Sequence, residues 1–222
     1  MRYSIEGGSL PVLIIQLDPG EQLISEAGGR TWCKGDVATE TTGGGGGALG
    51  RMLTGESLFL STYTAQSPAE IAFTSSFPGS IIARELGAGE SVIAQKTAFL
   101  CASSGVQLSV QANKKFTSGL LGGEGFIMQK VTGPGIAFFE IDGYCKEYDL
   151  APGERIVCDT GIMALMDETA TMDVEAVKGL KNKLLGGEGF FDTVLTGPGK
   201  VYLQSMTMPK IAQLIIPYIP RN

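Results

Sequence analysis

One short block of sequence occurs twice in this chain, and the distance between its copies constrains the fold more than any other feature. Residues 120–126 read Leu-Leu-Gly-Gly-Glu-Gly-Phe, and residues 184–190 repeat them letter for letter. A Thr-Gly-Pro-Gly turn follows each copy, at residues 132–135 and 196–199. Both parts recur after the same step of 64 residues, from 122 to 186 and from 132 to 196. A fixed period of this size marks a duplicated structural unit.

A second motif indicates three such units rather than two. A leucine followed three residues later by Gly-Glu occurs at residues 17–21, 86–90 and 150–154, with steps of 69 and 64 residues. Residues 52–59 stand where the missing first copy of the longer block is expected. We therefore predict repeats at 1–75, 76–140 and 141–206, with a glycine-rich loop at 43–50. A C-terminal helix and tail at 207–222 would follow.

Within each repeat the hydrophobic pattern is that of β-strands. Val106, Leu108 and Val110 alternate with polar residues, and Met172 and Val174 alternate with acidic ones. A period of two over short segments, with glycine turns between them, is typical of half-buried antiparallel strands. The continuous apolar run at residues 136–139 indicates a strand covered on both faces. The expected fold is all-β: three tandem β-sandwich-like repeats around a pseudo-threefold axis, closed by a short C-terminal helix.

The C-terminal segment has the start and stop signals of a helix. Residues 209–216 begin with a proline and end before Pro217, with Ile211, Leu214 and Ile215 on one face. We expect this helix to pack on the β body, with Tyr218 and Ile219 as an anchor. A contact between two chains is the alternative.

The repeated glycines and glutamates are the first group of candidate site residues. A carboxylate directly after a glycine turn can accept backbone N–H groups and close the loop. Acid–base catalysis needs two groups in different environments, and repetition works against that. These residues are therefore predicted to be structural: Gly20, Glu21, Gly89, Glu90, Gly153, Glu154, Gly123, Glu124, Gly187 and Glu188.

Five lysines are the second group. They cluster in the second and third repeats, and Lys114 and Lys178 occupy equivalent positions. If the repeats surround an axis, these lysines would share one rim, where they could bind RNA or another phosphate ligand. A solvated edge that discourages strand pairing is the alternative role. The candidate rim consists of Lys114, Lys115, Lys178, Lys181 and Lys183.

Composition bears mainly on catalysis and location. The chain of 222 residues has no histidine and a net charge of −6. It therefore lacks the usual general base and the commonest metal ligand, and no global positive field attracts nucleic acid. Cys33, Cys101, Cys145 and Cys158 lack metal-site spacing and are expected to be buried free thiols. We expect no cofactor, no bound metal, no enzymatic activity, no transmembrane segment and a cytoplasmic location.

The motifs together resemble a known family. Residues 53–59, the doubled Gly-Gly-Glu-Gly-Phe, the Thr-Gly-Pro-Gly turns and the ending Ile-Pro-Tyr-Ile-Pro at 216–220 are similar to a family of small bacterial and archaeal proteins. That family is of unknown function and is related to the fungal altered-inheritance-of-mitochondria (mitochondrial biogenesis) protein. The resemblance covers essentially the whole chain. It implies a double-stranded β-helix unit similar to the tryptophan RNA-binding attenuation protein, and it supplies no catalytic residues.

These observations favour a non-enzymatic scaffold or interaction protein. The alternative is a module that binds RNA or a small ligand on the repeat rim, and an enzyme using the β-helix interior comes third. Hydrophobic residues make up 43% of the chain and charged residues only 18%. Such a chain has more apolar surface than its own core hides, so we expect a homo-oligomer and protein partners, and no binding of RNA.

Overall fold

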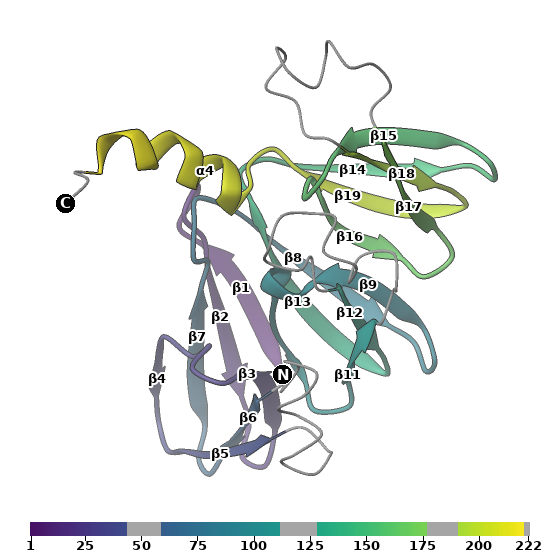
Figure 1. Ribbon diagram of the computed structural model, residues 1–222. Helices are drawn as coiled ribbons and strands as arrows, with labels where there is room; N and C mark the ends of the chain where they lie inside the picture. The colour runs from purple at the N-terminus through teal and green to yellow at the C-terminus, as the bar shows by residue number, and fades with distance from the viewer. Residues whose placement is uncertain (44–58, 112–127, 177–190, 220–222) are drawn as a thin grey trace.

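The computed structural model describes residues 1–43, 59–111, 128–176 and 191–219, and these residues form mostly antiparallel strands (Figure 1). The expected all-β class with one short C-terminal helix is confirmed. The first strands are β1 (Arg2–Glu6), β2 (Val12–Leu17), β3 (Gln22–Glu26), β4 (Trp32–Lys34), β5 (Val37–Gly43), β6 (Phe59–Ala65) and β7 (Ala69–Thr74). The next are β8 (Gly79–Leu86), β9 (Ser91–Gln95), β10 (Phe99–Ser103), β11 (Gln107–Gln111), β12 (Met128–Thr132) and β13 (Gly135–Asp142). The last are β14 (Cys145–Leu150), β15 (Arg155–Asp159), β16 (Met163–Asp167), β17 (Thr171–Ala176), β18 (Phe191–Thr196) and β19 (Gly199–Gln204).

Three short helical elements complete the described residues. The 3-10 helix η1 (Lys96–Ala98) lies between β9 and β10, and the α-helix α4 (Met208–Ile215) follows the last strand. A second 3-10 helix, η2 (Ile216–Tyr218), continues directly from α4.

The strands form four sheets, and two of these join successive parts of the chain. The sheet orders are β1-β2-β7-β4, β5-β6-β3-β10-β13-β8, β11-β12-β9-β16-β19-β14 and β15-β18-β17. Strand β3 pairs with β10, and β9 pairs with β16. Hydrogen-bonded sheets therefore run from the first third of the chain into the second, and from the second into the third.

The same pairing order occurs in three successive stretches of six strands, β2–β7, β8–β13 and β14–β19. In each, the sixth strand pairs with the first and the third. The fifth strand pairs with the second and the fourth. The second strand of one stretch then pairs with the third strand of the next.

The core is divided among three clusters of buried apolar side chains along the row of sheets. Strand β2 shows the local cause, because Leu13, Ile15 and Leu17 are buried and alternate with more exposed residues. The expected doubly covered strand is also present: Ala137, Phe138 and Phe139 on β13 are all fully buried. Burying side chains as large as these stabilises a fold by about 1.5–3 kcal/mol each.

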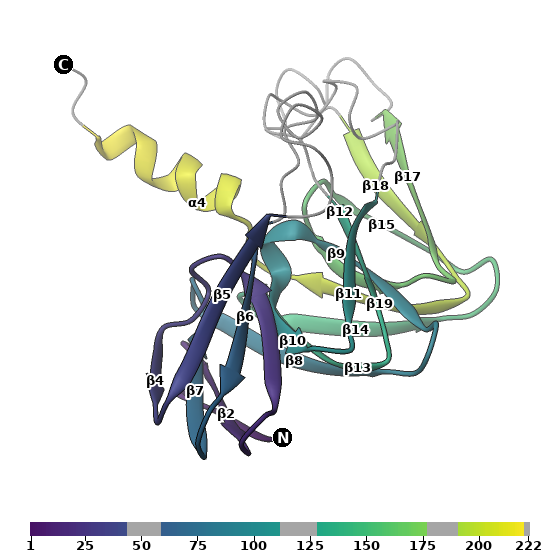
Figure 2. The same cartoon turned by 90° about the horizontal axis from the view of Figure 1, so that it is seen from below.

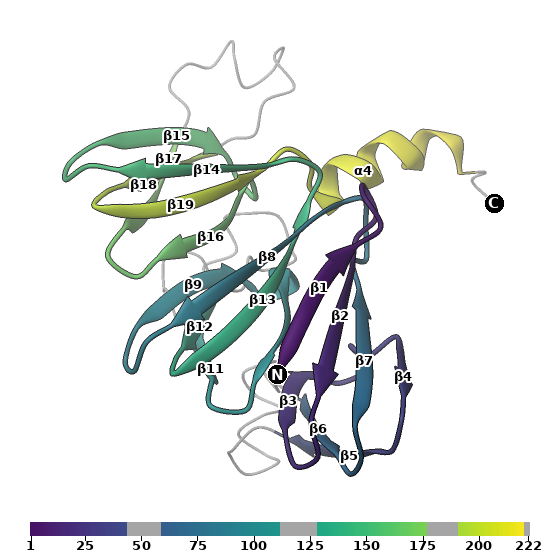
Figure 3. The ribbon, with the colours of Figure 1, turned by 180° about the vertical axis from the view of Figure 1, so that it is seen from behind.

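The row of sheets is open rather than closed. Strands β4 and β15 are the end strands of their sheets, and they lie at opposite ends of the β body in all three views (Figures 1, 2 and 3). Among the described residues, no strand of the first stretch pairs with a strand of the third. Strand pairing among the described residues therefore does not join the first stretch to the third, and the pseudo-threefold axis stays a prediction.

Helix α4 forms where it was predicted but does not pack where it was expected. Thr207 is the N-cap, its side chain accepts the backbone N–H of Lys210, and Pro209 stands in the first turn. No residue of α4 or η2 is buried, and the helix extends away from the β body (Figure 2). The expected packing of the helix on its own chain, with Tyr218 as an anchor, is wrong, since that side chain is 85% exposed.

Candidate functional site

The three glutamates that follow the turn glycines have the same structural role. Oε2 of Glu90 accepts the backbone N–H of Gly87 at 2.9 Å, and the N–H of Glu90 donates to the carbonyl oxygen of Gly87 at 3.1 Å. Glu21 and Glu154 make the corresponding two bonds with the residues three positions before them. Each carboxylate thus closes its own turn through one oxygen, and the other oxygen of Glu21 also binds the N-terminal ammonium group of Met1.

The glycines of these turns are required by backbone geometry. Gly20, Gly89 and Gly153 have φ values of 87°, 78° and 79°, in the left-handed region that favours glycine. In the adjoining Gly-Pro-Gly turn, a Cβ on Gly133 would lie 2.4 Å from the carbonyl oxygen of Gly87. The three turns therefore have matching backbone geometry.

The other candidates from the sequence lie outside the described residues. They are Gly123, Glu124, Gly187, Glu188 and the lysines Lys114, Lys115, Lys178, Lys181 and Lys183. The glycine-rich loop at 43–50 also lies outside them, except for Gly43 at the end of β5.

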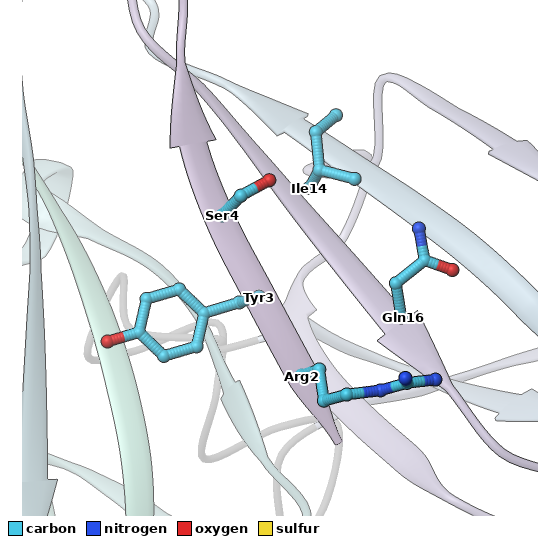
Figure 4. Close-up of a pocket in the computed structure, with 5 residues that line it drawn as sticks. All are labelled: Arg2, Tyr3, Ser4, Ile14 and Gln16. Atoms are coloured by element: carbon cyan, nitrogen blue, oxygen red, sulfur yellow. The ribbon is translucent and has the colours of Figure 1, made fainter.

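A shallow depression lies on the outer face of the first sheet. It has a volume of about 430 Å³ and is lined by Arg2, Tyr3, Ser4, Ile14 and Gln16 (Figure 4). Gln16 donates its amide to Glu70 at 2.7 Å, and Tyr3 points to the other side of β1, against the ring of Phe138. The guanidinium of Arg2 and a few polar groups could hold a small polar ligand. The hydroxyl of Ser4 donates to the carboxylate of Glu6 at 2.8 Å.

A polar network that the sequence did not reveal joins the second and third stretches. Arg84 on β8 forms an ion pair with Asp167 on β16, with 2.8 Å between Nη2 and Oδ1. Nη1 of Arg84 donates to the hydroxyl of Tyr202 at 2.9 Å, and the backbone N–H of Lys200 donates to Asp167 at 2.9 Å. Burial raises the pKa of the Tyr202 hydroxyl. The network therefore joins β8 to β16 and β19 across the junction of the second and third stretches.

The cysteines are all free, but they differ in exposure. Cys101 is fully buried, and burial raises its pKa well above the ordinary value. Burial and nearby carboxylates raise the pKa of Cys145 and of Cys158 to about 11. Cys33 on β4 is exposed and Cys145 and Cys158 are half-buried, so the expectation of buried thiols is confirmed only for Cys101.

The most distinctive surface is the apolar stripe of the C-terminal segment, which we define as Ile211, Leu214, Ile215, Tyr218 and Ile219. Leu214 is 66% exposed, and Ile215, Tyr218 and Ile219 are exposed by more than half. Within α4, Ile211, Leu214 and Ile215 lie on one side of the helix. Tyr218 lies in η2 and Ile219 directly after it, so the segment is a candidate contact surface.

The described residues contain neither a cluster of metal-ligating side chains nor a membrane-spanning helix. No group of three or more acidic, cysteine or histidine side chains within the described ranges is placed to hold a metal ion. None of the helices in those ranges is long and apolar enough to cross a membrane.

The fold and these surfaces define a protein of linked antiparallel β-sheets that ends in an unpacked amphipathic helix. A family model described as mitochondrial biogenesis AIM24 matches residues 3–206, and the chain belongs to this family. An uncharacterised protein of Streptococcus pyogenes serotype M6 is 26% identical over 233 aligned residues, covering 100% of this chain and 92% of that protein. A crystal structure of another Streptococcus pyogenes protein shares the fold, with a TM-score of 0.79 and 22% identity, covering 98% of this chain and 99% of that one.

Proposed function

We propose that this protein is a non-enzymatic scaffold that self-associates, and that the apolar stripe of α4 and η2 forms part of the contact. The observation that carries the proposal is the exposure of this segment: none of its residues is buried, and only Ile211 is half-buried. A capped helix with an apolar stripe loses less conformational entropy on binding than a disordered tail, because it is already ordered. Within one chain the stripe has no partner, so a second copy is the simplest occupant.

The proposal includes the arrangement of the scaffold. We propose that the three six-strand stretches are copies of one double-stranded β-helix unit, of the kind found in the tryptophan RNA-binding attenuation protein. The common order of strand pairing and the three matching Gly-Glu turns support this. The four free cysteines support a location in a reducing compartment, the cytoplasm.

We do not propose RNA binding. The lysines of the candidate rim lie outside the described residues, and the net charge of −6 gives little gain from release of counterions. A small ligand in the depression beside Arg2 has only one charged contact to support it.

The test measures the mass of the protein in solution by light scattering coupled to size exclusion. The full chain at tens of micromolar is expected to be larger than a monomer, and Leu214→Lys is expected to lower its mass by breaking the stripe. Gln213→Lys is the matched control, since it adds the same charge to an exposed neighbour outside the stripe. A chain truncated after Thr207 should behave as Leu214→Lys does and keep its thermal midpoint, because the removed helix buries nothing in the β body.

A strictly monomeric full chain would contradict the proposal. So would a Leu214→Lys variant with the mass of the wild type. If the full chain is monomeric and Leu214→Lys instead abolishes binding to phosphatidylglycerol vesicles, the stripe is a lipid contact and the scaffold proposal is wrong.

A further inference from the structure

We infer that copies of this chain assemble head to tail, with the β15 edge of one copy pairing antiparallel with the β4 edge of the next. The inference rests on the proposed self-association and on the equivalence of the three stretches. It identifies a contact that is separate from the apolar stripe of α4.

Strands β4 and β15 differ from the other sheet ends of the described chain. Strands β5, β11 and β17, the fourth of each stretch, are sheet ends in all three stretches. Strand β15 is the second strand of its stretch, and its counterparts β3 and β9 are both paired with the next stretch. Strand β4 is the third of its stretch, and its counterparts β10 and β16 are both paired with the preceding one. Strand β15 therefore leaves unpaired the edge that β3 and β9 use at the internal junctions, and β4 leaves unpaired the edge that β10 and β16 use.

The two internal pairings share one register, which sets the register of the third. Ser25 lies opposite Cys101 at the first junction, and Ala94 lies opposite Leu165 at the second. These positions differ by the repeat steps of 69 (25 to 94) and 64 (101 to 165). Applying the same steps to the two free edges (94 to 158, and 101 back to 32) places Cys158 opposite Trp32. Val157 then lies opposite Cys33, and Ile156 lies opposite Lys34.

Strands β4 and β15 carry apolar side chains like those of the junction strands, but in the described residues no neighbouring strand covers them. Cys101 and Leu165, which occupy the position of Trp32 at the internal junctions, are both 0% exposed, whereas Trp32 is 43% exposed. Ile93, which occupies the position of Val157, is 4% exposed, whereas Val157 is 59% exposed. The free edges thus carry apolar side chains at the positions that the internal junctions bury. Exposed apolar edge strands recruit another strand unless they are blocked.

The occupant is a second copy because the two edges cannot meet within one chain. Strands β4 and β15 lie at opposite ends of the β body (Figures 1 and 3). A contact between two different edges of identical chains is heterologous, so it continues from copy to copy and produces a closed ring or an open filament.

Disulfide trapping in the full chain tests the register directly. Residues directly opposite in an antiparallel pair have Cα atoms about 4.5–5.5 Å apart, within the range that a disulfide spans. Val157→Cys is therefore expected to form an intermolecular disulfide with the native Cys33 under mild oxidation, seen as dimers and longer ladders on a non-reducing gel. Adding Cys33→Ser to this variant should abolish the product, and mixing that double variant with wild-type chain should restore a dimer.

A shifted control separates the register from random oxidation. Ile156→Cys introduces a thiol one position away, on the other face of β15, and should give at least tenfold less product with Cys33. Equal cross-linking from positions 156 and 157, or none from position 157, would overturn the pairing.

A charge substitution gives a second readout. Val157→Lys should lower the mean mass of the full chain, whereas Tyr148→Lys, on the free edge of β14, should leave it unchanged. An equal effect of the two substitutions would count against the β15 contact.

The result is distinguishable from failure of the α4 contact. If position 157 gives no cross-link but truncation after Thr207 still reduces the mass, the edge pairing is wrong and the α4 contact stands. If the cross-link forms and the truncated chain keeps its mass, the edge pairing stands and α4 is not part of the contact.

Discussion

At the scale of single residues, the repeated Gly-Glu motif forms a tight turn and supplies a hydrogen-bond acceptor for a backbone N–H of that turn. A glycine with positive φ turns the chain, and the glutamate that follows it ties the turn with one side-chain and one backbone hydrogen bond. The carboxylate accepts a backbone N–H that strand pairing does not reach. Repetition of Gly-Glu at residues 20, 89 and 153 therefore follows from the fold, and a catalytic role is unnecessary to explain it.

This role predicts a stability effect without a functional one. Glu90→Ala removes the acceptor for the N–H of Gly87 and should lower the free energy of unfolding by about 1 kcal/mol. Glu85→Ala, a nearby exposed glutamate on β8, is the matched control and should change it by less than about 0.5 kcal/mol. Urea unfolding followed by circular dichroism measures both. Equal effects in the two variants would show that the turn bond contributes nothing specific.

At the scale of elements, the junctions between stretches combine strand pairing with one shielded ion pair. Arg84 on β8 reaches Asp167 on β16 and Tyr202 on β19, so the polar network ties the second stretch to the third. The side chains of the ion pair are only 14% and 23% exposed, whereas those of Arg155 and Glu175 are 53% and 58% exposed. Because the pair of Arg84 and Asp167 is shielded from water, it should affect the stability of the protein more than the exposed pair does.

The contrast predicts unequal costs for the same kind of substitution. Asp167→Ala leaves Arg84 without its charge partner and should destabilise the protein by about 2–3 kcal/mol. Glu175→Ala breaks an exposed pair and should cost less than about 1 kcal/mol. Denaturant unfolding of the two variants under the same conditions provides the comparison, and a cost for Asp167→Ala no larger than that for Glu175→Ala would contradict the account.

At the scale of the whole molecule, the open row of sheets determines what the protein can assemble into. A row that closed on itself would have no free junction strands, but this one ends in β4 and β15. Together with α4, which projects from the body (Figure 2), these edges are the surfaces through which we propose that the protein assembles.

Assembly through β4 predicts that one thiol becomes protected as copies associate. Cys33 is exposed in the single chain, so iodoacetamide should modify it readily at low protein concentration and at least several-fold more slowly at high concentration. Cys145, half-buried and away from both edges, should react at a rate that does not depend on protein concentration. Mass spectrometry after timed quenching measures both rates. An unchanged rate at Cys33 would place β4 outside the contact.

The local features of this protein could be predicted from its sequence. Turn geometry depends on residues within a few positions of each other, so the motifs at residues 17–21, 86–90 and 150–154 were sufficient to predict three similar turns. Period-two alternation similarly predicted strands, because successive side chains of a strand point to opposite faces. The helix predicted at 209–216 followed from its starting proline, its end before Pro217 and its apolar spacing, and the structure forms it at 208–215.

The tertiary structure alone decided what each element meets. The network of Arg84, Asp167 and Tyr202 joins residues 83 and more positions apart and carries no motif, so no sequence signal could have revealed it. The exposure of Cys33 and of α4 was also unpredictable. An apolar pattern shows which face of an element is apolar, but it does not show which other element packs against that face. Spacing in the sequence predicted three similar units, but which strands meet between them depends on contacts between distant residues. In the described residues, the row of sheets has β4 and β15 at its ends.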